Sequence, residues 1–280
     1  MPLVKAKIRV GHSPDPDDAF MFWAIAHDKM KTDGITFSHV IEDIESLNRR
    51  SFKSELEVTA VSAFTFFRIA DRYALMPCGA SIGDNYGPVL VSTRPMYPKE
   101  LRGKKIAVPG LNTTAYLALK LFLPEFEEKV VPFDKILESV QKGEVDAGLI
   151  IHEGQLTYGT LGFKKVADLG EWFHEQTNLP LPLGVDVIRK NLGRDVMRKA
   201  TKLFKMSIEY GLKHREDALA YAMKYGRGIE TPTADRFVGM YVNDYTVDMG
   251  RRGKDGLLAL QNMAVEAGFL ERAPIEMVDM

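Results

Sequence analysis

The sequence is poor in cysteine: Cys78 is the only one among 280 residues. A single thiol excludes an intrachain disulfide, a four-thiolate zinc site and a cysteine-ligated iron–sulfur cluster. The chain also lacks an excess of charge of either sign, with 37 basic side chains against 38 acidic ones. That balance leaves no electrostatic footprint for nucleic acid or for an anionic membrane surface. We therefore expect a protein that binds neither.

Long apolar runs are missing as well. No stretch approaches the roughly 18 consecutive apolar residues of a membrane-spanning helix, and no signal-peptide core follows Met1. The N-terminal stretch MPLVKAKIRVGHS instead alternates apolar and basic residues, which is typical of a β-strand. There is no internal repeat and no low-complexity tract. The sequence predicts a soluble, cytoplasmic protein that is ordered nearly throughout.

Familiar catalytic and cofactor signatures are absent too. There is no G-x-x-x-x-G-K-[ST] and no G-x-G-x-x-G after a strand, so a nucleotide or dinucleotide site has no support. Two His-Glu dipeptides begin like the zinc motif H-E-x-x-H, but Leu156 and Asn178 stand where the second histidine is needed. Carboxylates are scattered without the spacing of metal ligands. We therefore expect no cofactor and no metal, and a site made of a base, an acid and anion-binding amides.

What the sequence does contain is an alternation of strand and helix patterns. Three strand-like stretches, KIRVGHS, ITFSHVIED and EVTAVS, are separated by helical stretches near the N-terminus. The same units return between LRGKKIAVPG and EVDAGLIIHEG, and from Arg194 onward the pattern is helical. Because parallel strands need long crossover connections, this alternation indicates parallel sheets with helices on both faces.

Two further strand patterns flank the second set of units, at residues 87–95 (GPVLVSTRP) and 183–191 (LGVDVIRKN). We interpret them as two crossing strands that leave one lobe and return to it. The sequence thus predicts an α/β protein with one lobe of residues 1–90 and 187–280 and another of residues 91–186. Two lobes, two crossing strands and C-terminal helices are the plan of the type II periplasmic-binding-protein fold. That plan places a ligand in the cleft between the lobes.

Strand-to-helix turns could supply anion-binding amides to such a site. In VPGLNTTAY a glycine allows a tight turn, and Thr113 or Thr114 begins a helix with free N–H groups and a hydroxyl. A plain N-cap role is the alternative for Thr113. The same two interpretations apply in TAVSAF to Ser62, beside the amides of Ala60 and Val61.

The third turn, SPDPDD, holds Ser13, Asp17 and Asp18. Ser13 and Asp18 could face a ligand. Capping the helix that follows, whose apolar face includes Phe20 and Met21, is the more ordinary role for either aspartate.

The stretch GLIIHEGQLTY ends an apolar strand pattern in an imidazole, His152. A lone histidine is usually a bystander, and we interpret the other five in that way: His12, His27, His39, His174 and His214. His152 differs because it follows a buried strand. The carboxyl ends of such strands are where catalytic and ligand-binding side chains of α/β proteins are usually found. Imidazole titrates near neutral pH, which suits a general base. A histidine that only supports the strand tip is the alternative.

Six segments together resemble the 1,4-dihydroxy-6-naphthoate synthases of the futalosine route to menaquinone: SPDPDDAFMF, VPGLNTTAY, GEVDAGLIIHEGQLTY, DLGEWF, TNLPLPLG and YVNDYTVDMG. Of these segments, IIHEGQLTY and NLPLPLG are the most specific to that family. The resemblance implies a lyase that converts cyclic dehypoxanthinyl futalosine into 1,4-dihydroxy-6-naphthoate and dihydroxyacetone. It implies that His152 accepts a proton and that the turns contact the substrate through Ala60, Val61, Ser62, Thr113 and Thr114. Loss of one proton can drive carbon–carbon cleavage towards an aromatic product, so one base suffices.

The first turn departs from this resemblance. Family members often have S-P-C-P-N-D there, so that Asp17 replaces an amide with a carboxylate. We therefore place the substrate's carboxylate at the Thr113 turn or the Ser62 turn. Two alternatives remain: a chorismate dehydratase of the sister family, against which the histidine argues, and a solute-binding protein without chemistry, against which the missing export signal argues. The oligomeric state stays open.

Overall fold

The computed structural model describes residues 5–225 and 230–280, and the remaining segments of the predicted first lobe, 1–4 and 226–229, lie outside the described residues. Contacts between residues divide the chain into two compact units. Unit 1 comprises residues 1–82, 184–251 and 272–280, and unit 2 comprises residues 83–183 and 252–271.

The sheet of unit 1 has the order β2 (Ile35–Ile41), β1 (Ala6–His12), β3 (Val58–Ser62), β11 (Leu181–Arg189) and β4 (Tyr73–Leu75). β1 pairs in parallel with β2 and β3, while β11 runs antiparallel to β3 and β4. The parallel pairs follow from the helices that separate these strands along the chain, α1 (Pro16–Ala26) and α2 (Ile44–Ser51). The carboxyl ends of β1 and β3 therefore lie at one edge of this sheet.

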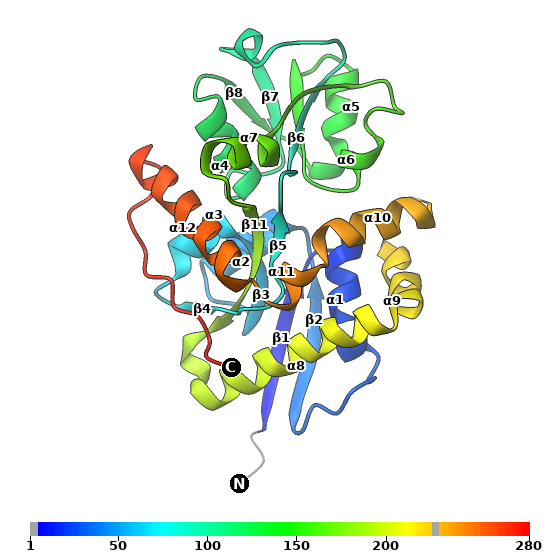
Figure 1. Ribbon diagram of the computed structural model, residues 1–280, viewed down its shortest axis with the longest axis vertical. Helices are drawn as coiled ribbons and strands as arrows, with labels where there is room; N and C mark the ends of the chain where they lie inside the picture. Colours follow the sequence, from blue (N-terminus) through cyan, green and yellow to red (C-terminus); the bar gives the residue numbers. More distant parts are fainter. Residues whose placement is uncertain (1–4, 226–229) are drawn as a thin grey trace. The chain divides into compact units, whose positions relative to one another are not determined.

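The main core of unit 1 lies between this sheet and its long helices. Ile8 and Val10 of β1 pack in one cluster with Phe20 of α1 and with Phe204 and Ile208 of α8 (Arg194–Lys213). Figure 1 shows α8 running past β1 and β2. The other helices of this unit are α3 (Ala63–Ile69), α9 (Arg215–Ala222), α10 (Thr231–Tyr241) and α11 (Asp244–Val247).

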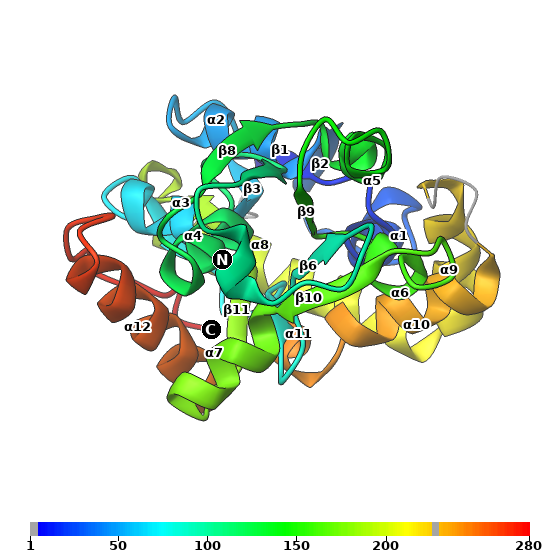
Figure 2. The ribbon, with the colours of Figure 1, turned by 90° about the horizontal axis from the view of Figure 1, so that it is seen from above.

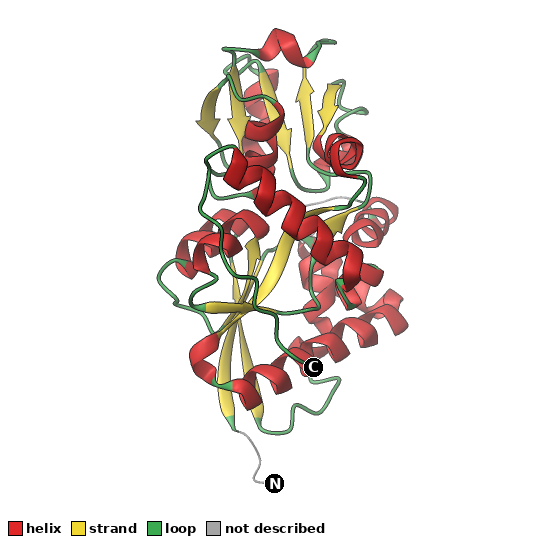
Figure 3. Cartoon of the chain, turned by 60° about the vertical axis from the view of Figure 1, so that its left-hand side comes forward, coloured by secondary structure: helices red, strands yellow, loops and turns green. Residues whose placement is uncertain are grey.

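The sheet of unit 2 has the order β10 (Lys164–Asp168), β6 (Val89–Ser92), β9 (Ala147–Ile150), β7 (Lys105–Val108) and β8 (Glu127–Val130). β7 is parallel to β8 and β9, and β6 is antiparallel to β9 and β10. Gly148 of β9 lets α5 (Ile136–Gln141) approach closely, since an added Cβ would stand 2.5 Å from Ile136 Cγ2. Figures 2 and 3 show helices along both faces of this sheet, which include α4 (Thr114–Phe122), α6 (Gly154–Thr157) and α7 (Leu169–Thr177).

The segments that connect the units differ in part from the expected ones. The predicted crossing strand at 183–191 largely coincides with β11, which holds residues of both units. The predicted strand at 87–95 is β6, which lies within the sheet of unit 2. The chain leaves unit 1 one strand earlier, at β5 (Ser81–Gly83), which pairs with β11. A strand of three residues is too short to give a period-two pattern in the sequence.

Most of helix α12 (Gly250–Glu266) groups with unit 2, whereas the predicted boundaries placed it in the first lobe. Its Gly256 lies directly on the backbone before β11, where an added Cβ would stand 2.4 Å from the Pro180 carbonyl oxygen. The guanidinium of Arg252 donates to the Asn178 carbonyl at 3.4 Å. The sequence indicates a helix here, but nothing local specifies the surface on which it packs. Of the helices in the described ranges, none has the length and apolar character that crossing a membrane requires.

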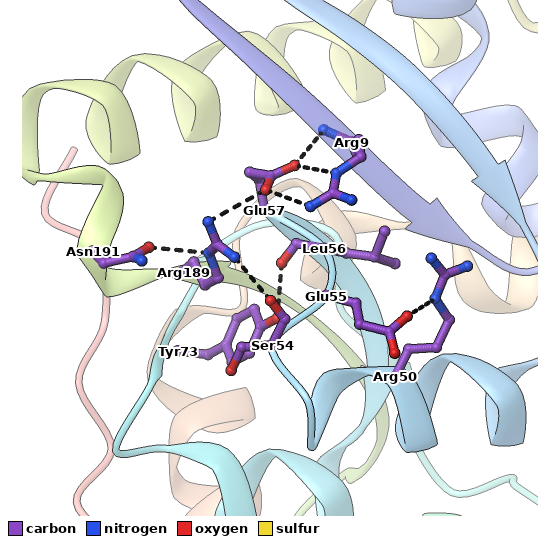
Figure 4. Close-up of polar contacts among 9 residues, drawn as sticks. All are labelled: Arg9, Arg50, Ser54, Glu55, Leu56, Glu57, Tyr73, Arg189 and Asn191. Atoms are coloured by element: carbon purple, nitrogen blue, oxygen red, sulfur yellow. Dashed lines mark hydrogen bonds and ion pairs between the residues drawn. The ribbon is translucent and has the colours of Figure 1, made fainter.

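A polar network ties together the strands β1, β3 and β11 (Figure 4). The carboxylate of Glu57 accepts from Arg9 Nε and Nη2, both at 2.9 Å, and stands 3.3 Å from Arg189 Nη2. The bonds from Arg9 hold the pKa of Glu57 below its ordinary value. A carboxylate with a depressed folded-state pKa stabilises the fold above its unfolded pKa, and that contribution disappears as the pH falls through the folded value.

We expect Glu57→Gln to lower the free energy of unfolding by about 1 kcal/mol at pH 7, because half-exposed Arg9 is screened by solvent. The difference from wild type should shrink as the pH falls below the ordinary glutamate pKa of about 4.3, because the unfolded wild-type chain then binds a proton before the folded protein does. Urea titrations at pH 7 and pH 3.5 measure both quantities. Glu55→Gln is the matched control, since the side chain of Glu55 is 37% exposed against 10% for Glu57, and it should change stability by less. A pH-independent loss in Glu57→Gln would contradict the ionic explanation.

Candidate active site

His152 lies just beyond β9, on the segment that leads into α6. All four residues of β9 are fully buried, and they hold the strand's tip in the core of unit 2. His152 as a whole residue is only 9% exposed. Its Nε2 stands 3.0 Å from the Phe133 carbonyl oxygen, and its Nδ1 accepts from the Gly154 N–H at 3.0 Å. The side chain thus occupies one defined position at the carboxyl end of a buried strand.

The Thr113 turn also belongs to unit 2, at the start of α4. Thr113 Oγ1 accepts from the Tyr116 N–H at 3.1 Å and donates to the Gly110 carbonyl at 2.9 Å, so this side chain is an N-cap. Thr114 Oγ1 donates to the Leu183 carbonyl at 2.7 Å and thereby links the segments VPGLNTTAY and NLPLPLG. A hydroxyl has one proton, so neither threonine donates to a ligand while these bonds persist. An anion at this turn would be bound first by backbone N–H groups.

The Ser62 turn belongs to unit 1, where β3 ends and α3 begins. Ser62 makes no side-chain cap and is bound instead by Asn48 of α2, which is fully buried. The amide of Asn48 donates from Nδ2 to Ser62 Oγ at 3.1 Å and accepts the Ser62 N–H at 2.9 Å. Ala60 and Val61 pair with Asp186 and Val185 of β11. The sequence analysis missed Asn48, and the one available signal was a polar residue next to Leu47 on a short helix.

The first turn differs from the expectation that Asp17 or Asp18 caps the helix. α1 begins at Pro16 with Asp15 as N-cap residue, and Asp18 Oδ2 instead accepts the Ser13 N–H at 2.7 Å. Burial raises the pKa of Asp18 to about 6, although the bond from Ser13 acts in the opposite direction. Burial and the charge of Asp18 raise the pKa of Asp17 well above its ordinary value. The first turn is therefore a buried acidic position, which suits an anionic ligand poorly.

Two further buried groups in unit 1 escaped the sequence analysis. Asp186 is 1% exposed, and neither of its carboxylate oxygens has a hydrogen-bond partner among the described residues. Burial and the nearby Asp18 raise its pKa well above the ordinary value. Gly79 makes room for it, since an added Cβ would stand 2.1 Å from Asp186 Oδ2. An aspartate inside the apolar pattern LGVDVIRKN was the available signal.

His12, which the sequence analysis grouped with the bystanders, is 1% exposed at the carboxyl end of β1. Its Nδ1 lies 2.9 Å from the Ser13 carbonyl oxygen, and its Nε2 lies 3.2 Å from His39 Nδ1. The carbonyl can only accept, so His12 carries its proton on Nδ1 and accepts from His39. Burial lowers the pKa of His12 to about 4, which keeps it neutral.

The predicted site residues thus form one group in each unit. Unit 2 holds His152, Thr113 and Thr114, and unit 1 holds Ala60, Val61 and Ser62. The expectation that both groups contact one substrate stays a prediction. In residues 5–225 and 230–280, no three histidine, cysteine, aspartate or glutamate side chains are placed so that they could hold a metal ion.

Residues 8–266 match the model of a family described as menaquinone biosynthesis. A protein of Thermus thermophilus named 1,4-dihydroxy-6-naphtoate synthase is 36% identical over 267 residues, which cover 95% of this chain and 97% of that protein. A crystal structure of an Archaeoglobus fulgidus protein is 48% identical, with a TM-score of 0.90 over 94% of this chain and 98% of that one. A Candida albicans protein described as having the generic periplasmic-binding-protein fold is 13% identical, with a TM-score of 0.67 over 97% of this chain and 98% of that one. The last match shows the fold, which is the one predicted.

Proposed function

The chain belongs to the menaquinone biosynthesis family, and we propose that it is a 1,4-dihydroxy-6-naphthoate synthase with His152 as its general base. Its substrate would be cyclic dehypoxanthinyl futalosine, and its products 1,4-dihydroxy-6-naphthoate and dihydroxyacetone. The observation that carries this proposal is the similarity to a protein of that name along nearly the whole of both chains. The place of His152, buried at the tip of β9, supports the base role.

The proposed reaction requires the protein to position one base and to bind the substrate's carboxylate. His152 would remove a proton from the saturated part of the substrate, and the electron pair would form a double bond in the ring as the carbon–carbon bond to the three-carbon fragment breaks. The fragment would leave with the bonding pair and take up a proton to become dihydroxyacetone. The gain of aromatic character drives this step. The amides at the start of α4 suit the substrate's carboxylate, and the Ser62 turn offers a hydroxyl fixed by Asn48. We propose a cytoplasmic enzyme that acts on this small carboxylated substrate without a cofactor.

A direct assay separates this function from its two alternatives. Purified protein incubated with cyclic dehypoxanthinyl futalosine should form the naphthoate, which its absorbance reports, and should leave chorismate unchanged. Dehydration of chorismate would favour the sister enzyme instead. Saturable binding of either compound without turnover would favour a solute-binding protein.

We expect Thr114→Val to weaken substrate binding by about 1–3 kcal/mol if the hydroxyl turns from the Leu183 carbonyl to the substrate's charged group. The same change leaves that carbonyl without its partner and should lower the free energy of unfolding by about 1 kcal/mol. Titration calorimetry with the substrate and thermal melts measure the two effects separately. Thr114→Ser is the matched control because it keeps the hydroxyl. Unchanged affinity in Thr114→Val would remove this hydroxyl from the site.

A further inference from the structure

The surroundings of His152 define where its ring carries a proton. The Phe133 carbonyl can only accept a hydrogen bond, so the Nε2 that lies 3.0 Å from it carries hydrogen. The Gly154 N–H can only donate, so the Nδ1 that it reaches presents a lone pair. His152 is therefore a neutral imidazole of the Nε2–H form in this structure. Both of its nitrogens are engaged by the backbone.

A ring held in this way cannot accept a proton without changing its contacts. Only Nδ1 has a lone pair to take the proton, and the resulting imidazolium carries hydrogen on both nitrogens. The Nε2–H remains satisfied by the Phe133 carbonyl. The new Nδ1–H, however, would oppose the Gly154 N–H, which stands 3.0 Å away and offers no acceptor. A proton-accepting histidine here needs a different partner for Nδ1.

The next residue supplies that partner. Glu153 Oε2 lies 3.7 Å from His152 Nδ1, and both side chains are largely buried, 7% and 11% exposed. A shift of the carboxylate by less than about 1 Å would bring its oxygen within hydrogen-bond distance of Nδ1. Burial matters because an uncompensated cation in a protein interior is costly, while a paired one is much less so.

We propose that Glu153 is a positioning residue for the reaction: once His152 has accepted a proton on Nδ1, the Glu153 carboxylate replaces the Gly154 amide as the partner of that nitrogen and stabilises the imidazolium. The proposal rests on the general-base role proposed above. The glycine at position 154 fits this exchange, since an added Cβ would stand 2.8 Å from His152 Cε1 and 3.2 Å from Nδ1. Any other residue there would push the ring away from the amide and the carboxylate that alternate at Nδ1.

Nuclear magnetic resonance of protein labelled with ¹⁵N-histidine tests the contact without substrate. In the neutral form of the ring, the wild type should show hydrogen on Nε2 and none on Nδ1. At a pH acidic enough to form the imidazolium, wild-type Nδ1–H should be protected from exchange with water. In Glu153→Met, which removes the acceptor at similar volume, that signal should broaden or vanish, while Nε2–H, held by Phe133, persists. Equal protection of Nδ1–H in both proteins would overturn the proposal.

Kinetics provide the second readout. Glu153→Gln should lower kcat by about 10–100-fold, the usual effect of losing a partner that orients a catalytic group, with KM changed by less than about threefold. Glu153→Asp keeps the carboxylate and should recover part of the rate. Glu175→Gln, which follows His174 in the other His-Glu dipeptide, is the matched control and should match wild type in both experiments. Wild-type kcat in a Glu153→Gln protein that melts normally would also overturn the proposal.

The two experiments separate a failure of the positioning role of Glu153 from a failure of the general-base role of His152. If His152→Asn retains wild-type turnover, the general-base role fails, and the kinetic arm fails with it. The resonance of Nδ1–H would still report whether Glu153 is the partner of the protonated ring, because it requires no catalysis. The spectrum of His152→Asn identifies the signals of this histidine among the six in the chain.

Discussion

Replacement of His152 by asparagine should lower turnover by about 10²–10⁴-fold, which is the usual effect of losing a general base and corresponds to about 3–5 kcal/mol in the barrier. The oxygen of an asparagine amide can accept the Gly154 N–H as Nδ1 does, but the amide cannot accept a proton near neutral pH. Substrate affinity should change little, because asparagine preserves much of the side chain's polar reach. Steady-state kinetics on the pure variant measure kcat and KM separately.

A histidine that only supports the tip of β9 would give the opposite pattern. The melting temperature would fall, while the folded fraction would keep a near-normal rate. Both quantities should therefore be measured on one preparation of His152→Asn. His174→Asn is the matched control, since His174 also precedes a glutamate but belongs to α7 and is only half-buried. Activity of His152→Asn within a few-fold of wild type would remove His152 from the mechanism.

The sequence predicted most accurately what depends on neighbouring residues. The apolar run that ends at Ile151 predicts a buried strand with His152 beyond its tip, and β9 followed by α6 confirms that placement. The threonine after a tight turn predicts the start of α4, and Thr113 is its N-cap. These features follow from periodicity and capping, which a short window of sequence contains.

Contacts between distant segments could not be read in the same way. Phe133 binds His152 across 19 positions, and Asn48 binds Ser62 across 14, yet neither partner stands in a recognisable motif. The first turn shows a related limit. Two aspartates at the start of an apolar helix predict a cap, but the fold buries Asp18 against the Ser13 amide instead. Tertiary burial therefore overrode the local preference at this position.

One segment of the family resemblance, DLGEWF, has a structural explanation at Gly170 in α7. The N-terminus of this helix is capped by Asp168, whose Oδ1 accepts the Gly170 N–H at 2.8 Å, and Leu169 donates to the Pro88 carbonyl at 2.9 Å. These bonds draw the helix against the backbone before β6. An added Cβ at Gly170 would stand 2.0 Å from both the carbonyl carbon and the oxygen of Tyr86. Backbone atoms cannot move aside as a flexible side chain can, so only glycine fits here.

We expect Gly170→Ala to lower the free energy of unfolding by about 3 kcal/mol, at the upper end of the usual range for overpacking, because the clash is with main chain. The Asp168 cap and the contact with the segment before β6 should weaken together, and turnover should fall only as far as the folded fraction does. Thermal melts and urea titrations measure the loss. Gly159→Ala in the same unit is the matched control, since an added Cβ there meets nothing within 4 Å and the backbone is not left-handed. It should be neutral or slightly stabilising. Equal stability of the two variants would show that α7 can shift away from Tyr86 at little cost, and the close approach would then not explain the glycine.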